Sequence, residues 1–176
     1  MTAHLDPRPR ELSPDAFIAR FGGIYEHSPW VAAGVLTSGL TARDDAPDAL
    51  AARMAAVVEA AGRDRQLALL RAHPELAGKL AVRGELTSDS RAEQASARLD
   101  QCSPDEFARF TTLNTAYTAK FGFPFIIAVR GLQRGGILAA FEQRVNNTTE
   151  IEFRTALDQV HKIARLRLAA LPRTGG

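Results

Sequence analysis

The sequence predicts an all-α fold, a compact single-domain bundle of seven to eight helices. Three observations support this class. Signals that begin and end helices recur along the 176 residues, and alternating strand patterns are almost absent between them. A βαβ alternation is missing, as are the nucleotide-binding motifs GxGxxG and GxxxxGKS/T. One apolar stretch interrupts the helical pattern, so we expect a short extended segment near residues 123–129.

The first two helices are predicted from serine–proline pairs. Ser13 is a candidate N-cap, Pro14 suits the first helical position, and Gly22 ends the helix. Ser28 and Pro29 repeat the pattern and predict a second helix start.

Two further helices are expected in the first half of the chain. Residues 45–62 are rich in alanine, the best helix former, and end at a glycine. Residues 63–72 predict a fourth helix. It must end near His73, because Pro74 disfavours helical backbone in the residue before it.

In the second half, Ser103 and Glu106 form a capping-box pattern that predicts a helix ending at Gly122. Its expected apolar face consists of Phe107, Phe110, Leu113 and Tyr117. Residues 135–147 predict a shorter helix, and Thr149 with Glu152 predicts the start of the last one. That helix carries an apolar stripe of Ile151, Ala156, Leu157, Val160, Ile163, Ala164 and Leu168.

The composition argues against several classes of protein. The net charge is +2 without a block of like charges, so a nucleic-acid partner is not expected. No apolar run approaches the ~18 residues of a membrane span, and we expect a cytoplasmic protein. Cys102 is the only cysteine, which leaves no internal disulfide. The four histidines form no HExxH pattern, so a metal site is not expected either.

The two ends of the chain are expected to be loose. The first residues are polar, contain two prolines and lack the apolar core of a signal peptide, so we predict a flexible N-terminal arm over residues 1–12. The helical domain is expected over residues 13–172, and the last residues are expected to fray.

His73 is the first candidate for catalysis. A histidine held just beyond a helix end by Pro74 suits a group that gives or takes a proton near neutral pH. The alternative is structural, since a histidine in this position also caps the C-terminus of the preceding helix.

Ser90, Glu93 and Gln94 are the second candidate. Together they offer a hydroxyl, a carboxylate and an amide within one helical turn, which suits binding of a polar heterocycle. The alternative is that Ser90 and Glu93 are simply a capping box.

Two arginines in the last helix are candidates for binding a carboxylate. Arg165 and Arg167 lie about 200° apart around a helix, so they cannot serve the same purpose. Whichever arginine binds, its planar guanidinium matches a carboxylate in two parallel hydrogen bonds.

Segment 125–129 follows Pro124, which has no backbone N–H group. No partner strand is predicted, so we expect its backbone groups to remain free for other partners. A ligand is one candidate partner. The alternative is a short segment that crosses the core and is satisfied by neighbouring helices.

Three stretches carry a resemblance to a known family. They are HPELAGKLA at residues 73–81, LTSDSRAEQASARL at 86–99 and LNTAYTAKFGFPFIIAVRG at 113–131. In this order and spacing the chain resembles the 2-oxo-4-hydroxy-4-carboxy-5-ureidoimidazoline (OHCU) decarboxylase family, over nearly its full length.

The resemblance implies an enzyme of urate degradation that converts OHCU to (S)-allantoin and CO2, needs no metal or organic cofactor, and forms a homodimer. It implies that His73 is the catalytic histidine. From the chemistry of the reaction we hypothesise that His73 delivers the stereodetermining proton, with Glu93 as the second catalytic residue. The implied substrate-binding residues are Pro74, Ser90, Gln94, Phe125, Ile126, Ile127, Ala128, Val129 and Arg167, although Arg165 lies near the last of them.

Two other functions remain open at this level. One is a non-catalytic helical module that binds a small ligand or DNA as a regulator. The other is a hydrolase or lyase acting on a related ureide such as allantoin. The arginines of the last helix are spread around it, which does not match a basic recognition helix.

Overall fold

The computed structural model describes residues 3–174, except for the side chains of residues 79 and 80. The chain forms two compact units. Unit 1 contains the residues up to Ala72 and those from His161 onward, and unit 2 runs from His73 to Val160.

The all-α class is confirmed. The described residues contain nine α-helices, one more than the upper expected number; the additional helix is the short α5. The helices are α1 Pro14–Phe21, α2 Trp30–Thr37, α3 Pro47–Ala60, α4 Arg63–Arg71, α5 Lys79–Arg83, α6 Ser88–Ser96, α7 Pro104–Phe121, α8 Arg134–Arg144 and α9 Thr149–Ala169. Short 3-10 turns occupy η1 Pro9–Glu11, η2 Ala42–Asp45 and η3 Leu99–Gln101. None of the described helices is long and apolar enough to cross a membrane.

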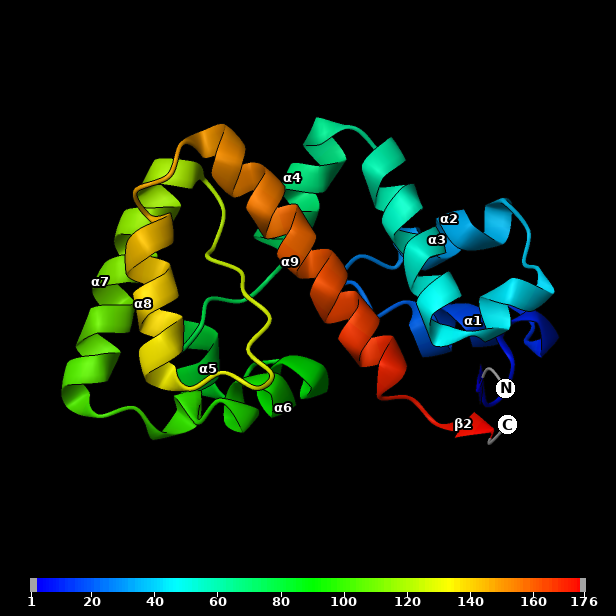
Figure 1. Cartoon of the computed structure of the whole chain (residues 1–176), viewed down its shortest axis with the longest axis horizontal. Helices are drawn as coiled ribbons and strands as arrows, with labels where there is room; N and C mark the ends of the chain where they lie inside the picture. The colour runs from blue at the N-terminus through cyan, green and yellow to red at the C-terminus, as the bar shows by residue number, and fades with distance from the viewer. Residues whose placement is uncertain (1–2, 175–176) are drawn as a thin grey trace. The chain divides into compact units, whose positions relative to one another are not determined.

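In unit 1 the described residues near both termini form a small sheet. Strand β1 (His4–Leu5) pairs antiparallel with β2 (Arg173–Thr174), and Leu5 is fully buried. The arm predicted to be flexible therefore contains a strand, a 3-10 turn and a core residue, and the end predicted to fray supplies the partner strand (Figure 1).

The two serine–proline pairs of unit 1 behave differently. Ser13 caps α1 as predicted, since its Oγ accepts a hydrogen bond from Ala16 N at 3.3 Å. The prediction for Ser28 is wrong: Pro29 occupies the N-cap position of α2, and the Ser28 hydroxyl donates to the Glu26 carbonyl instead.

In unit 2, α7 is capped as predicted. Ser103 and Glu106 form a complete capping box, and Gly122 ends the helix with φ of 76°, a conformation that glycine adopts without strain. Of the predicted apolar face, Phe110 and Tyr117 are fully buried, whereas Phe107 is 42% exposed.

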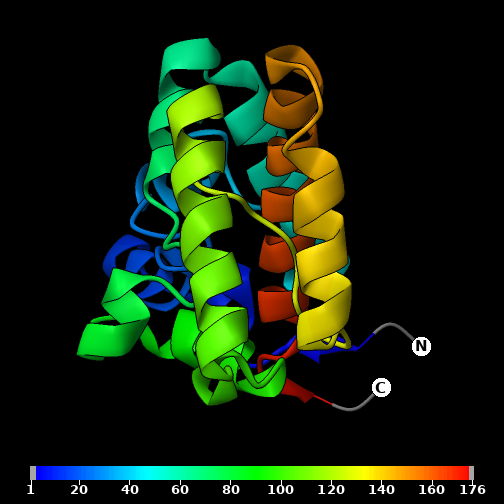
Figure 2. The same ribbon diagram turned by 90° about the vertical axis from the view of Figure 1, so that its left-hand side faces the viewer.

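Aromatic residues hold the segment that follows α7. The rings of Tyr117, Phe121, Phe123 and Phe125 contact one another, and Phe125 stacks on Phe141 of α8 with ring centroids 3.9 Å apart. The residues between Gly122 and α8 form an irregular extended trace that joins the end of α7 to the start of α8 (Figures 1 and 2), as the sequence predicted.

Helix α9 begins at Thr149, as predicted. The hydroxyl of the preceding residue, Thr148, accepts a hydrogen bond from Ile151 N at 3.4 Å. Ile151 is 54% exposed and does not belong to the buried stripe, while the other six predicted stripe residues are buried.

Candidate active site

The loop between α4 and α5 carries the first candidate residue. Helix α4 ends at Arg71 with Ala72 as its C-cap, and His73 follows at once as the first residue of unit 2. The His73 side chain is buried, whereas Pro74 is half-buried. Four residues later Ala77 has φ of 48°, which is uncommon for a residue with a side chain and indicates that its surroundings fix the loop.

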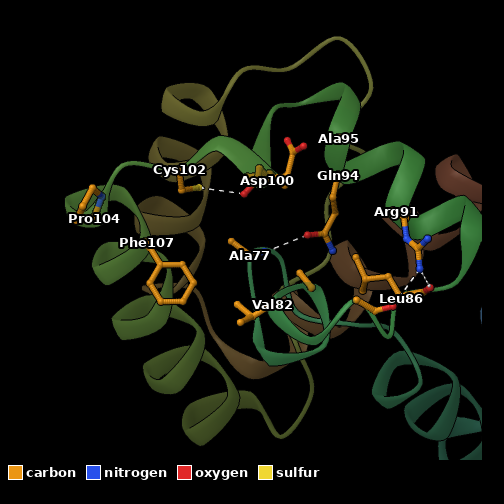
Figure 3. Close-up of a pocket in the computed structure, with 13 residues that line it drawn as sticks. Ala77, Val82, Leu86, Arg91, Gln94, Ala95, Asp100, Cys102, Pro104 and Phe107 are labelled. Carbon is orange, nitrogen blue, oxygen red and sulfur yellow. Dashed lines mark hydrogen bonds between the residues drawn. The ribbon is translucent and has the colours of Figure 1, made fainter.

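Two amide side chains fix this loop. Gln94 of α6 accepts from Ala77 N at 3.1 Å (Figure 3) and donates to the Glu75 carbonyl at 3.3 Å. Asn114 of α7 donates to the Leu76 carbonyl at 3.0 Å. The backbone of Glu75, Leu76 and Ala77 is therefore held by side chains of two helices. The Gln94 amide was expected to bind substrate, but both its oxygen and its nitrogen are hydrogen-bonded to this loop.

Asn114 was missed at the sequence level. It lies four residues after Phe110 and three before Tyr117, so it occupies the buried face of α7, and it is only 4% exposed. A polar residue at an apolar position of a predicted helix is the signal that identifies it.

Helix α6 presents Ser90, Glu93 and Gln94 on one face, because residues three and four apart are neighbours on a helix. The alternative of a capping box is wrong, since α6 begins earlier and Thr87 is its N-cap, accepting from Ser90 N at 3.3 Å. Ser90 and Gln94 are buried and Glu93 is half-buried. The Ser90 hydroxyl and the Glu93 carboxylate are therefore not required to cap α6.

Segment 125–129 is partly satisfied by protein groups, which corrects the expectation that its backbone remains free. The Ile126 carbonyl accepts from Arg144 Nη1 at 2.8 Å, and Ala128 N donates to Gln159 Oε1 at 2.9 Å. Within residues 3–174, no protein acceptor is found for the amides of Phe125, Ile127 and Val129.

The two candidate arginines both lie in unit 1 and differ in environment. Arg167 is buried and pairs with Glu26, with Nη1 and Oε2 2.9 Å apart; the same nitrogen lies 3.4 Å from the carbonyls of Gly23 and Ile24. Arg165 pairs with Asp48 at 2.8 Å, and both side chains are about two-thirds exposed. Arg167 therefore has the fixed position that a binding residue needs, and sequence reasoning missed its partner Glu26.

A cavity of about 680 Å³ lies in unit 2 beside α6. Of the predicted site residues it is lined by Gln94 alone, whose side chain points toward Ala77 (Figure 3). A neighbouring cavity of about 400 Å³ is lined by Glu75 and Asn114, and the two cavities share Ala77, Val82 and Phe107. Both cavities therefore border the loop that carries His73.

Cys102 also lines the larger cavity. Its thiol donates to the Leu99 carbonyl, and burial together with the nearby Glu106 carboxylate raises its pKa. The reactive thiolate form is therefore disfavoured, as expected for a structural cysteine. In the described part of the chain, no three His, Cys, Asp or Glu side chains are grouped as metal ligands.

The chain is similar to known proteins over most of its length. A family model described as OHCU decarboxylase matches residues 10–169. The 2-oxo-4-hydroxy-4-carboxy-5-ureidoimidazoline decarboxylase of Haloferax volcanii is 48% identical over 162 residues, which cover 90% of each chain. The Mus musculus protein of the same name is 37% identical over 88% of this chain and 85% of its own.

Solved structures show the same fold. A crystal structure of (S)-allantoin synthase superposes with a TM-score of 0.71 at 35% identity, covering 92% of this chain and 52% of that one. This chain thus spans about half the length of that protein. A structure of OHCU decarboxylase in the presence of (S)-allantoin gives a TM-score of 0.63 at 24% identity, covering 80% and 88%. Because the family model matches residues 10–169, the chain belongs to the OHCU decarboxylase family.

Proposed function

We propose that this protein is a carboxy-lyase of urate degradation that converts OHCU to (S)-allantoin and CO2. The observation that carries the proposal is the family match over residues 10–169. The described geometry supports it, because unit 2 presents a buried histidine on a clamped loop and a serine, a glutamate and a glutamine on one helix face.

The reaction does not require a cofactor to accept electrons, because the substrate ring can accept them. In OHCU the carboxylate is attached to a carbon that also bears a hydroxyl and adjoins a C=N bond. When the bond to CO2 breaks, its electron pair forms a carbon–carbon double bond and the C=N pair moves to nitrogen. That nitrogen takes up a proton. The hydroxyl then loses its proton to become a carbonyl as another proton adds to the former imine carbon. The protein must orient the substrate and deliver that proton to one face.

The residues receive roles that match their chemistry. His73 is the acid that protonates the new stereocentre, and Glu93 takes the hydroxyl proton or holds His73 and the ring in place. Ser90, Gln94 and the backbone of segment 125–129 bind ring and ureido groups, and Pro74 fixes the backbone beside His73. Arg167 pairs with the substrate carboxylate or a carbonyl oxygen; its burial and its fixed position favour it over Arg165.

The decisive measurement follows the circular dichroism of OHCU generated from urate, with and without the protein. Spontaneous decay gives racemic allantoin and hence no lasting signal, whereas the enzyme is expected to produce the signal of (S)-allantoin together with faster CO2 release. A reaction that stays racemic at micromolar protein overturns the proposed function.

We also propose that the protein works as a homodimer in the cytoplasm. The exposed apolar side chains of Val82 and Phe107, which are 70% and 42% exposed, are candidates for the contact surface. Light scattering should give twice the chain mass of 19.1 kDa, and Val82→Glu should shift the population toward the monomer. A wild-type mass of one chain at all concentrations contradicts the dimer, and cell fractionation tests the compartment.

A further inference from the structure

A buried ion pair closes the turn between α8 and α9. Glu152 is fully buried and accepts hydrogen bonds from Arg144 Nη2 at 2.9 Å and from Asn147 Nδ2 at 3.0 Å. The Tyr117 hydroxyl donates to the same carboxylate. Burial and the hydrogen bond to Glu152 raise the pKa of Tyr117, so the hydroxyl keeps the proton that it donates. The carboxylate is thus satisfied from three side chains, as a buried charge requires.

Arg144 also holds the segment that follows α7. Its Nη1 donates to the Ile126 carbonyl at 2.8 Å, and its guanidinium lies over the Phe125 ring, 4.4 Å from the centroid. Further along the segment, Ala128 N donates to Gln159 Oε1 at 2.9 Å. The side chains of Arg144 and Gln159 therefore hold the backbone at Ile126 and Ala128.

This pattern distinguishes the two edges of the segment. In an extended chain the N–H and C=O groups of one residue point to one side, and those of the next residue point to the other. The groups bound by Arg144 and Gln159 therefore lie on one edge. The amides of Phe125, Ile127 and Val129, for which the described residues provide no acceptor, lie on the opposite edge.

Amides on a buried segment need acceptors, because an unpaired buried N–H group costs free energy. Phe125 and Val129 are 1% and 5% exposed. We propose that Arg144 and Gln159 are positioning residues that bind one edge of segment 125–129, so that the amides of its other edge receive oxygen atoms of the substrate. The inference rests on the proposed function. OHCU offers such oxygens on its ring carbonyl, ureido group and carboxylate.

Gln159 provides the cleaner test, because its loss leaves no buried charge. Gln159→Leu removes the acceptor of Ala128 N, whereas Gln159→Glu keeps one and is expected to restore function. Gln143→Leu, an exposed change on α8, is the matched control. We expect Gln159→Leu to raise the KM for OHCU by about tenfold, since small misplacements of binding groups are costly, and the other two variants to stay near wild type.

The KM separates positioning from simple loss of structure. A variant that unfolds in part loses kcat in proportion to the missing molecules, while the KM of the remaining ones is unchanged. Arg144→Lys is a second test: its ammonium group still pairs with Glu152, but it lacks the planar fork that also reaches Ile126 and covers Phe125. Arg144→Lys should therefore raise the KM for OHCU, as Gln159→Leu does.

Amide hydrogen exchange tests the contact without substrate. Exchange of the Ala128 amide should accelerate in Gln159→Leu and stay slow in Gln159→Glu and Gln143→Leu. Unchanged exchange overturns the contact, and faster exchange with a wild-type KM overturns the positioning role. A wild-type protein that forms no (S)-allantoin overturns the proposed function instead, and this is seen before any variant is measured.

Discussion

His73 illustrates how a single residue depends on its backbone. Its side chain is buried at the start of a loop whose next turn is tied to α6 and α7. We predict that His73→Asn lowers kcat/KM for (S)-allantoin formation by about 100-fold or more, the usual range for a lost general acid.

The control for this prediction is His27→Asn, an exposed histidine whose φ of 49° asparagine tolerates. It should retain full activity, and both variants should melt near the wild-type temperature. A folded His73→Asn protein with near-normal turnover excludes His73 as the proton donor.

Gln94 has a structural role that the sequence did not indicate. Gln94→Leu leaves the Ala77 amide and the Glu75 carbonyl without their partner, so we predict a loss of about 1–3 kcal/mol in the free energy of unfolding. Urea titration measures it, with exposed Gln101→Leu as the matched control. Equal midpoints for the two variants contradict the role of Gln94 in holding the loop.

At the scale of elements, the capping box of α7 should stabilise the unit that carries the candidate site. Ser103→Ala removes the acceptor of Glu106 N and is predicted to cost about 1 kcal/mol of unfolding free energy. Ser88→Ala, on an exposed residue in the first turn of α6, should change stability by less than about 0.5 kcal/mol. Chemical denaturation of both variants decides the matter, and equal losses would refute the prediction.

Helix starts were predictable where one local signal stood alone, as at Ser13 and Ser103. They were mispredicted where several candidate capping residues lie close together, because the sequence cannot rank them: Pro29 and not Ser28 is the N-cap of α2, and Thr87 and not Ser90 caps α6. The β1–β2 pair was missed for another reason. It joins residues almost a whole chain apart, and two residues per strand leave no periodic pattern.

At the scale of the whole molecule, stability should depend on pH through Glu152. Burial alone would raise the pKa of this carboxyl group, but hydrogen bonds from Arg144, Tyr117 and Asn147 outweigh it and lower the pKa. A carboxylate whose pKa is lowered in the folded state stabilises the protein above its unfolded pKa of about 4.3. This contribution is lost as the pH falls through the folded value.

We therefore predict that Glu152→Gln is less stable than wild type at pH 7 and that the difference shrinks as the pH falls below about 4. Thermal melts across this range measure the difference. Glu85→Gln, on an exposed residue, serves as the control and should follow the wild-type curve. A gap between Glu152→Gln and wild type that stays constant with pH contradicts the assignment.

The candidate site was predictable to the extent that its residues carry their own chemistry. His73, Ser90 and Glu93 stand out as groups that can exchange protons or hydrogen-bond a ligand. Arg144, Gln159 and Asn114 did not stand out, because each acts on backbone atoms that are distant in sequence. Their partners become visible only when the irregular segments are placed in three dimensions.

The pairing of His4–Leu5 with Arg173–Thr174 has a practical consequence for engineering. Because these residues are neighbours, a short glycine–serine linker can join them, and new ends can be opened at the exposed Gly62 between α3 and α4. Such a circular permutant should keep the same core. For the same reason this chain can be inserted into a surface loop of a host protein, because its two connections to the host would lie side by side.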